Sequence, residues 1–169
     1  TPANLDARSQ RFELAPGLKV ALLPKTTRGS VVTATLRLHL GDEQTLRGQS
    51  TVAALAGSLL DKGGAGLTRQ QIADQFDRRR AQEGIGIDGQ LLSVSITTTR
   101  EHLPAVVSLV GRLLREPAFP ADVLEESRSQ WLAGIERQRK EPEALVSDAI
   151  DRHGNPYPRG DLRHAPTFD

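Results

Sequence analysis

The stretch Leu-Leu-Ser-Val-Ser-Ile-Thr-Thr-Thr, residues 91–99, and the stretch that follows it, residues 101–115, decide the fold class. In the first, aliphatic and hydroxyl side chains alternate and β-branched residues are frequent, which predicts a strand with one buried face. In the second, apolar residues recur three and four positions apart, and Pro104 falls in the first turn, where a helix tolerates it. The apolar positions of this helix are Leu103, Val106, Val107, Val110, Leu113 and Leu114.

Immediately upstream, the sequence predicts another helix and a glycine-rich connection. Thr68 and Gln71 have the spacing of a capping box, and the helix that follows has Ile72 and Phe76 on its apolar side. Residues 84–89, Gly-Ile-Gly-Ile-Asp-Gly, match the spacing of a dinucleotide-binding fingerprint. That fingerprint needs a strand before it and a helix after it, whereas here the order is reversed. We therefore interpret these glycines as a turn or the edge of a strand.

The N-terminal half supplies further strands. Residues 11–14 and 19–23 are short apolar-rich runs separated by Ala15-Pro16-Gly17, which predicts a β-hairpin. Residues 31–40 alternate apolar and polar side chains with a period of two, as a half-buried strand does. In residues 50–62 the apolar side chains change to helical spacing, and the segment Gly63-Gly64-Ala65-Gly66 ends this helix. Its expected buried stripe comprises Val52, Leu55, Leu59 and Leu60.

Helices dominate the C-terminal half. One is expected from Ala121 to about Lys140, with Trp131 in the core, and another from Ala144 to about Ile150, followed by a polar, proline-rich tail over residues 155–169. Strands followed by helices, with short connections, predict an α+β fold: a mostly antiparallel sheet covered on one face by helices. The length of 169 residues suits a single domain over residues 1–169.

Composition excludes several functional classes. Twenty-two Lys and Arg against 21 Asp and Glu give a net charge of +1, and the basic runs contain no aromatic side chains, so neither nucleic acid nor a membrane is an expected partner. The chain has no cysteine, which excludes disulfides and thiolate-bound metals. It also has no methionine, so we expect it to be a segment of a longer translated product.

The four histidines offer little chemistry. None of them pairs with another at the four-residue spacing that places two imidazoles on one helix face around zinc. His153, Asp151 and Asp161 lie in one segment and could orient a proton transfer, which leaves open an independent enzyme. Without a recognisable nucleophile context, solvation of a helix end explains these three residues better.

Five segments in series nevertheless resemble one domain of the pitrilysin/insulinase-like zinc metallopeptidases. They are residues 12–24, 40–43, 59–63, 113–119 and 155–158, the last reading Asn-Pro-Tyr-Pro. The resemblance implies the pitrilysin/processing-peptidase-like fold. Because a family domain would continue beyond Thr167-Phe-Asp169, it also implies that the fold is incomplete at the C-terminus.

The zinc motif of that family, His-x-x-Glu-His, is degenerate in this chain. If Gly63-Gly64 corresponds to the Gly-Thr pair that follows the motif, the two histidine positions fall on Ala54 and Ser58, and the glutamate base falls on Gly57. None of these side chains can bind zinc or activate a water molecule. The resemblance therefore implies no catalytic residue, no metal site and no cofactor in this chain.

The downstream glutamate ligand of the family would fall near Gly134, with Glu136 as the nearest carboxylate. In the family, homologous domains are paired, and only one of each pair holds the zinc. The resemblance is strongest to a non-catalytic domain of long bacterial members, which implies a periplasmic location.

The expected function is a zinc-free structural and substrate-enclosing domain. Its partners would be other pitrilysin-like domains of the same protein and the peptide substrate, and the zinc of the whole metalloendopeptidase would lie in another domain. The alternative is a non-catalytic, processing-peptidase-like assembly subunit.

Overall fold

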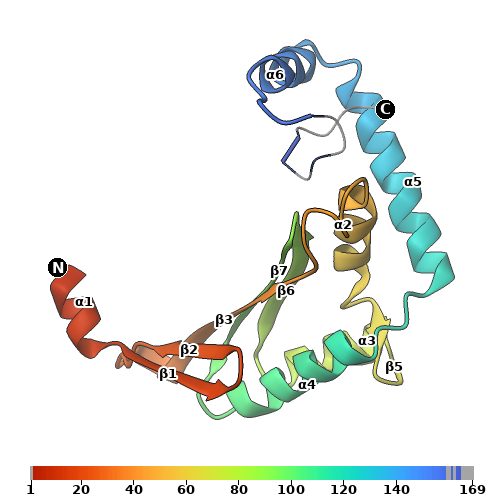
Figure 1. The fold of residues 1–169 in the computed structure, drawn as a ribbon. Coiled ribbons are helices and arrows are strands. Elements are labelled where there is room, and N and C mark those ends of the chain that lie inside the picture. Colours follow the sequence, from red (N-terminus) through yellow and green to blue (C-terminus); the bar gives the residue numbers. More distant parts are fainter. Residues whose placement is uncertain (1, 159–160, 162, 165–169) are drawn as a thin grey trace. The chain divides into compact units, whose positions relative to one another are not determined.

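A computed structural model describes residues 2–158, 161 and 163–164, and the chain divides into two compact units, residues 1–31 and 32–169. The first unit contains helix α1 (Pro2–Arg8) and the strands β1 (Gln10–Ala15) and β2 (Leu18–Leu22) (Figure 1). The two strands form the expected antiparallel hairpin, in which Phe12 lies opposite Val20. The turn uses Gly17 at φ 82°, a conformation that glycine adopts without strain.

A short 3-10 helix (Arg28–Ser30) lies at the end of the first unit, and β3 (Val31–His39) follows it. The second unit holds the remaining elements. In chain order there follow α2 (Ser50–Leu59), β4 (Gly63–Gly64), β5 (Leu67–Thr68), α3 (Arg69–Asp77), β6 (Gln82–Asp88), β7 (Leu91–Thr99), α4 (Leu103–Arg115), α5 (Ala121–Gln138) and α6 (Pro142–His153). Among these helices and α1, none is long and apolar enough to cross a membrane.

Three strands form the main sheet in the order β3-β7-β6. Strands β6 and β7 are an antiparallel hairpin in which Asp88 lies opposite Leu91, and Gly89 turns the chain at φ 56°. The glycines of residues 84–89 thus lie in an edge strand and its turn, which confirms the interpretation of this segment. Strands β4 and β5 form a separate two-stranded antiparallel ribbon.

The core lies between one face of this sheet and the helices α3 and α4. On β7 the side chains of Leu92, Val94 and Ile96 are buried, while Ser95 between them is exposed, so the period of two separates an apolar from a polar face. The helices contribute Ile72, Phe76, Val106, Leu109, Val110 and Leu113 to the same cluster. This arrangement confirms the α+β class with an antiparallel sheet.

The predicted capping box is present at the start of α3. The Gln71 backbone N–H donates to the Thr68 hydroxyl oxygen at 3.3 Å, and the Thr68 backbone N–H donates to the Gln71 side-chain oxygen at 2.9 Å. These bonds satisfy two N–H groups that a helix start otherwise leaves unpaired. On the helix that follows, Ile72 and Phe76 face the core.

Two expectations about burial are wrong. Val52 is 61% exposed, because it lies in the first turn of α2, about 140° around the helix from the face that meets β6. Trp131 is 38% exposed on α5, a helix in which no residue is buried. Trp131 does lie at helical spacing with other apolar residues of α5, but the described part of the chain does not cover its side chain.

Candidate functional site

Helix α2 carries the three positions that the resemblance assigns to the zinc motif, and Gly57 is the informative one. It is buried, and a Cβ atom added to it would lie 2.7 Å from the backbone nitrogen of Ile87 on β6 and 2.9 Å from the Ile87 Cγ1. Real Cβ atoms essentially never approach other atoms so closely. The helix therefore packs directly on the strand at this point, and a glutamate side chain has no space there. Gly57 thus lies on the face of α2 that meets β6.

The flanking positions add no ligand. Ser58 is half-buried, and its hydroxyl donates to the backbone carbonyl of Leu55 at 2.7 Å, so it bonds within its own helix. Ala54 is also half-buried and has no polar atom in its side chain. Zinc in a peptidase needs imidazole or carboxylate lone pairs, which neither residue supplies.

Helix α5 lies against α2, in the region where the resemblance places a downstream ligand. Gly134 lies within this helix, and the nearest carboxylate, Glu136, is exposed and pairs with Arg139 at 3.6 Å. Across the described residues, no group of three or more His, Asp and Glu side chains could hold a metal ion. One surface carboxylate next to α2 is insufficient for such a site.

A half-buried carboxylate lies on β6. Burial raises the pKa of Glu83, and the nearby Asp61 carboxylate raises it further, while Lys62 opposes the shift. Lys62 itself pairs with Asp61 at 2.6 Å. A raised pKa is typical of catalytic acids, but it also arises in structural ion pairs. Because no histidine or nucleophile is seen bonded to Glu83, we assign it no catalytic role.

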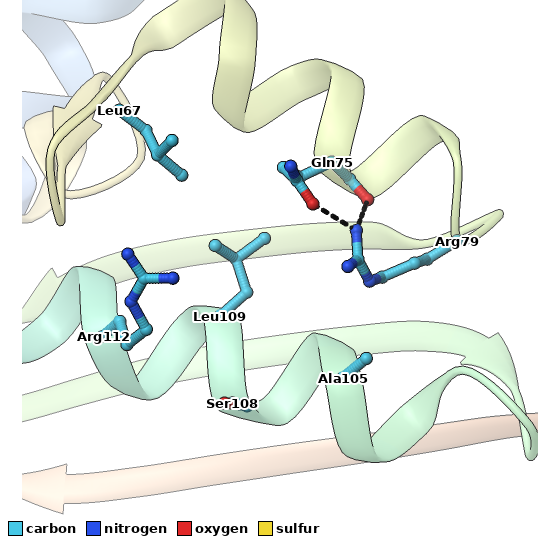
Figure 2. A pocket seen from close by; sticks show the side chains of 7 residues that line it. All are labelled: Leu67, Gln75, Arg79, Ala105, Ser108, Leu109 and Arg112. Carbon is cyan, nitrogen blue, oxygen red and sulfur yellow. Dashed lines mark hydrogen bonds between the residues drawn. The ribbon is translucent and has the colours of Figure 1, made fainter.

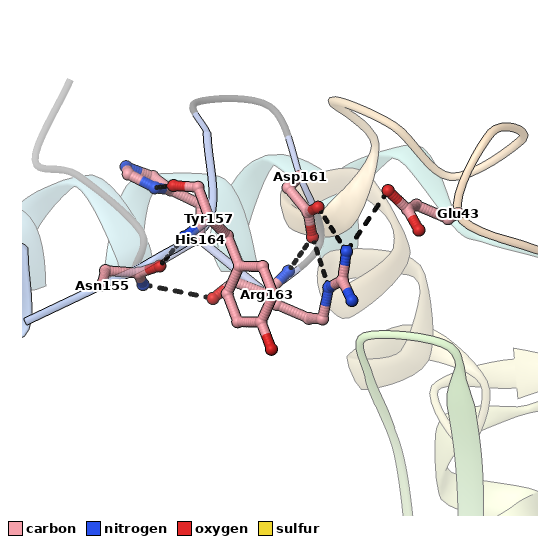
Figure 3. Close-up of polar contacts among 6 residues, drawn as sticks. All are labelled: Glu43, Asn155, Tyr157, Asp161, Arg163 and His164. Atoms are coloured by element: carbon pink, nitrogen blue, oxygen red, sulfur yellow. Dashed lines mark hydrogen bonds and ion pairs between the residues drawn. The ribbon is translucent and has the colours of Figure 1, made fainter.

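The alternative acid-base group does not assemble. Asp161 is buried and accepts hydrogen bonds from the Arg163 guanidinium at 2.6 and 2.8 Å (Figure 3). His153, in contrast, is exposed at the end of α6. The bonds from Arg163 hold the pKa of the Asp161 carboxyl well below its usual range and raise the pKa of Arg163. Asp161 is thus engaged in an ion pair instead of orienting His153 for proton transfer.

Arg163 organises the described part of the tail. Its guanidinium lies 4.1 Å from the centre of the Tyr157 ring and 3.3 Å from the Glu43 carboxylate, in the loop after β3 (Figure 3). The Asn155 side-chain amide donates to the Arg163 carbonyl at 3.2 Å. This network could not be predicted from the sequence, because only the fold brings residues 43 and 163 together. The one local signal for the network is that Asp161 and Arg163 have opposite charges and are two residues apart in the sequence.

Comparisons with known proteins agree with this geometry. A scan of protein-family models found no match, and a search of the curated proteins found none either. Among solved structures, the chain is similar to the inactive domain of a peptidase M16 from Pseudomonas fluorescens, with 25% sequence identity and a TM-score of 0.79. That match covers 93% of this chain and 38% of the other.

Two further structures share the fold. A protease from Helicobacter pylori has 15% identity and a TM-score of 0.72, over 92% of this chain and 37% of its own. The periplasmic protease PqqL from Escherichia coli has 12% identity and a TM-score of 0.74, over 94% of this chain and 17% of its own. The chain spans less than half the length of each of these three structures. The chain therefore has the pitrilysin-like, M16 peptidase fold and is similar to a domain of the inactive kind, which confirms the resemblance seen in its sequence.

Proposed function

We propose that this chain serves as a zinc-free structural and substrate-enclosing domain of a pitrilysin-like metallopeptidase. The observation that carries the proposal is the direct packing of Gly57 on β6, at the position that the resemblance assigns to the catalytic base. A zinc peptidase needs ligands for the metal and a base for its bound water. With Ala54 and Ser58 at the ligand positions, this chain offers neither, so the bond-breaking residues of the whole protein would lie in another domain.

The exposed apolar residues of α5 and α6 support pairing with another domain. Neither helix contains a buried residue, although both have large apolar side chains. These are Trp131, Leu132, Leu145, Val146 and Ile150. Clusters of exposed apolar side chains typically mark protein interfaces. Under this proposal residues 1–169 are part of one domain, and a second pitrilysin-like domain of the same protein covers α5 and α6.

A peptide is the proposed substrate of the whole protein. The order β3-β7-β6 places β6 at an edge of the main sheet, where α2 packs on it at Ile87, and an extended peptide could bind through main-chain hydrogen bonds to the part of this edge that α2 leaves open. The neighbouring Escherichia coli protein is a periplasmic protease, and we propose the same compartment for the present protein.

Incubating the chain with an unfolded protein, with and without added zinc, tests the absence of catalysis. Mass spectrometry is expected to find no new peptide fragments, because no metal-bound water is available as nucleophile. Cleavage that a chelator stops and that persists after repurification would contradict the proposal.

The pairing is tested with a separately purified second pitrilysin-like domain and two matched variants. Leu132→Asp on α5 and Val107→Asp on α4 introduce the same charge at side chains that are 51% and 48% exposed. We expect Leu132→Asp to abolish association and Val107→Asp to leave it unchanged. Equal effects of both variants, or no association of the unaltered chain, would contradict the proposed interface.

A further inference from the structure

Two arginines from different helical segments line one cavity on the second unit. Arg79 follows the C-terminal end of α3, and Arg112 belongs to α4. The cavity has a volume of about 240 Å³. Its lining comprises Leu67, Gln75, Arg79, Ala105, Ser108, Leu109 and Arg112, and we call it the two-arginine cavity. Nothing in the proposed function uses it.

Arg79 is held in place by neutral groups. Its backbone carbonyl accepts a hydrogen bond from the hydroxyl of Thr98 on β7, which is 2% exposed, at 2.7 Å. Its guanidinium Nη1 donates to the backbone carbonyl of Gln75 at 2.7 Å and to the Gln75 side-chain oxygen at 2.5 Å. The Nε and Nη2 donors have no acceptor among the described residues. The side chain is therefore fixed in position, while the described residues use only part of its hydrogen-bonding capacity.

Arg112 is anchored in a similar way. Its Nη2 donates to the backbone carbonyl of Ala65, in the turn between β4 and β5, at 2.9 Å. Within the described ranges, neither Arg112 nor Arg79 forms an ion pair with a carboxylate. Figure 2 shows the Leu109 side chain standing between the two arginines. The cavity thus presents two cationic ends with an apolar side chain between them.

The hydrogen bonds that the two arginines donate to backbone carbonyls explain only part of their arrangement around the cavity. Each arginine bonds neutral acceptors with one nitrogen, which leaves the planar fork that matches a carboxylate. Charge-assisted bonds of this kind are about twice as strong as neutral ones. The volume of the two-arginine cavity lies below the range of roughly 300 to 1,000 Å³ that is typical of sites for drug-sized ligands. A space of this size suits a ligand that places only a few atoms next to each arginine. We propose that the two-arginine cavity binds a ligand with two carboxylates joined by an apolar portion, such as an acidic–apolar–acidic peptide segment.

An NMR titration of the ¹⁵N-labelled chain tests this proposal with three probes. These are N-acetyl-Glu-Leu-Glu-amide, the uncharged N-acetyl-Gln-Leu-Gln-amide, and glutarate as a free dicarboxylic acid. We expect the charged peptide to shift the Nε–H signals of Arg79 and Arg112 in a saturable way, and the uncharged peptide to leave them in place. If glutarate causes saturable shifts and the charged peptide does not, the cavity is a dicarboxylate site, and its ligand is a small free acid instead of a peptide.

Matched variants separate a built site from general surface charge. Arg79→Gln and Arg112→Gln should each weaken binding about tenfold or more, as loss of a charged hydrogen-bonding partner does. Arg115→Gln removes the same charge from the same helix, outside the cavity lining, and should leave the affinity unchanged. If Arg112→Gln disturbs the turn at Ala65, the effect of Arg79→Gln on peptide affinity is the deciding result. Absence of saturable shifts, binding of the uncharged peptide, or an equal loss with Arg115→Gln would overturn the proposal.

Discussion

Replacing Gly57 with alanine should fail to stabilise the chain, although alanine is the better helix former. Gly57 lies within α2, where exchange of glycine for alanine ordinarily gains about 1 kcal/mol. The added Cβ, however, would lie 2.7 Å from the backbone nitrogen of Ile87. Because backbone cannot rotate out of the way as a flexible side chain can, α2 or β6 has to move.

The expected magnitude follows from these opposing effects. Overpacking a well-packed site typically costs about 1 to 3 kcal/mol. After the gain in helix propensity, Gly57→Ala should change the free energy of unfolding by about 0 to −2 kcal/mol. Gly111→Ala on α4 is the matched control, because its nearest neighbour would be the Arg115 Nη1 at an ordinary 3.6 Å. This variant should gain about 1 kcal/mol.

Urea denaturation followed by far-UV circular dichroism measures both variants. The free energies are compared by linear extrapolation, and equal slopes would show that the unfolded states are alike. We expect Gly111→Ala to be more stable than Gly57→Ala by about 1 to 3 kcal/mol, which is the overpacking contribution alone. Equal stabilisation by the two substitutions would refute it, since α2 could then not pack directly on β6.

The same assay should show that Leu59→Ala, at a side chain that is 2% exposed, costs about 2 to 5 kcal/mol, whereas Ser58→Ala stays near 0.5 kcal/mol. Greater damage from Ser58→Ala would mean that α2 is rotated and that the zinc-motif assignment has to be abandoned. In the tail, Arg163→Gln should return the lowered pKa of Asp161 to the usual carboxyl range, as measured by NMR titration. Because the folded-state pKa of Asp161 is lowered, the Asp161–Arg163 pair stabilises the fold at pH values above the usual carboxyl pKa, and this contribution is lost as the pH falls through the folded-state pKa. An unchanged titration of Asp161 in the variant would exclude Arg163 as the cause.

Elements specified by neighbouring residues could be predicted from the sequence. The capping box of Thr68 and Gln71 is complete within four residues, and the structure contains both of its hydrogen bonds. The strand over residues 91–99 has the predicted bounds, because alternation of side chains directly reflects the strand period. Helix α1 was not anticipated, since its seven residues have neither a buried side chain nor an acidic first turn.

Features that depend on tertiary contact could not be predicted. The apolar spacing of α2 suggested Val52 as a buried residue, but the close approach to Ile87 that Gly57 permits sets the rotation of the helix. Trp131 has core-like spacing on a helix that the described residues leave uncovered. The contact between Glu43 and Arg163 joins distant parts of the sequence, so no local pattern indicates it. For the candidate site, the sequence showed the missing side chains, and only the structure showed the missing space.

The zinc content of the purified chain tests the central claim most directly. The chain is equilibrated with zinc, dialysed against metal-free buffer and examined by elemental analysis. The proposed zinc-free domain predicts far less than one zinc ion per chain, because Ala54, Gly57 and Ser58 provide no ligand and α2 packs directly on β6. One zinc ion per chain, retained through dialysis and released only by a chelator, would contradict the account.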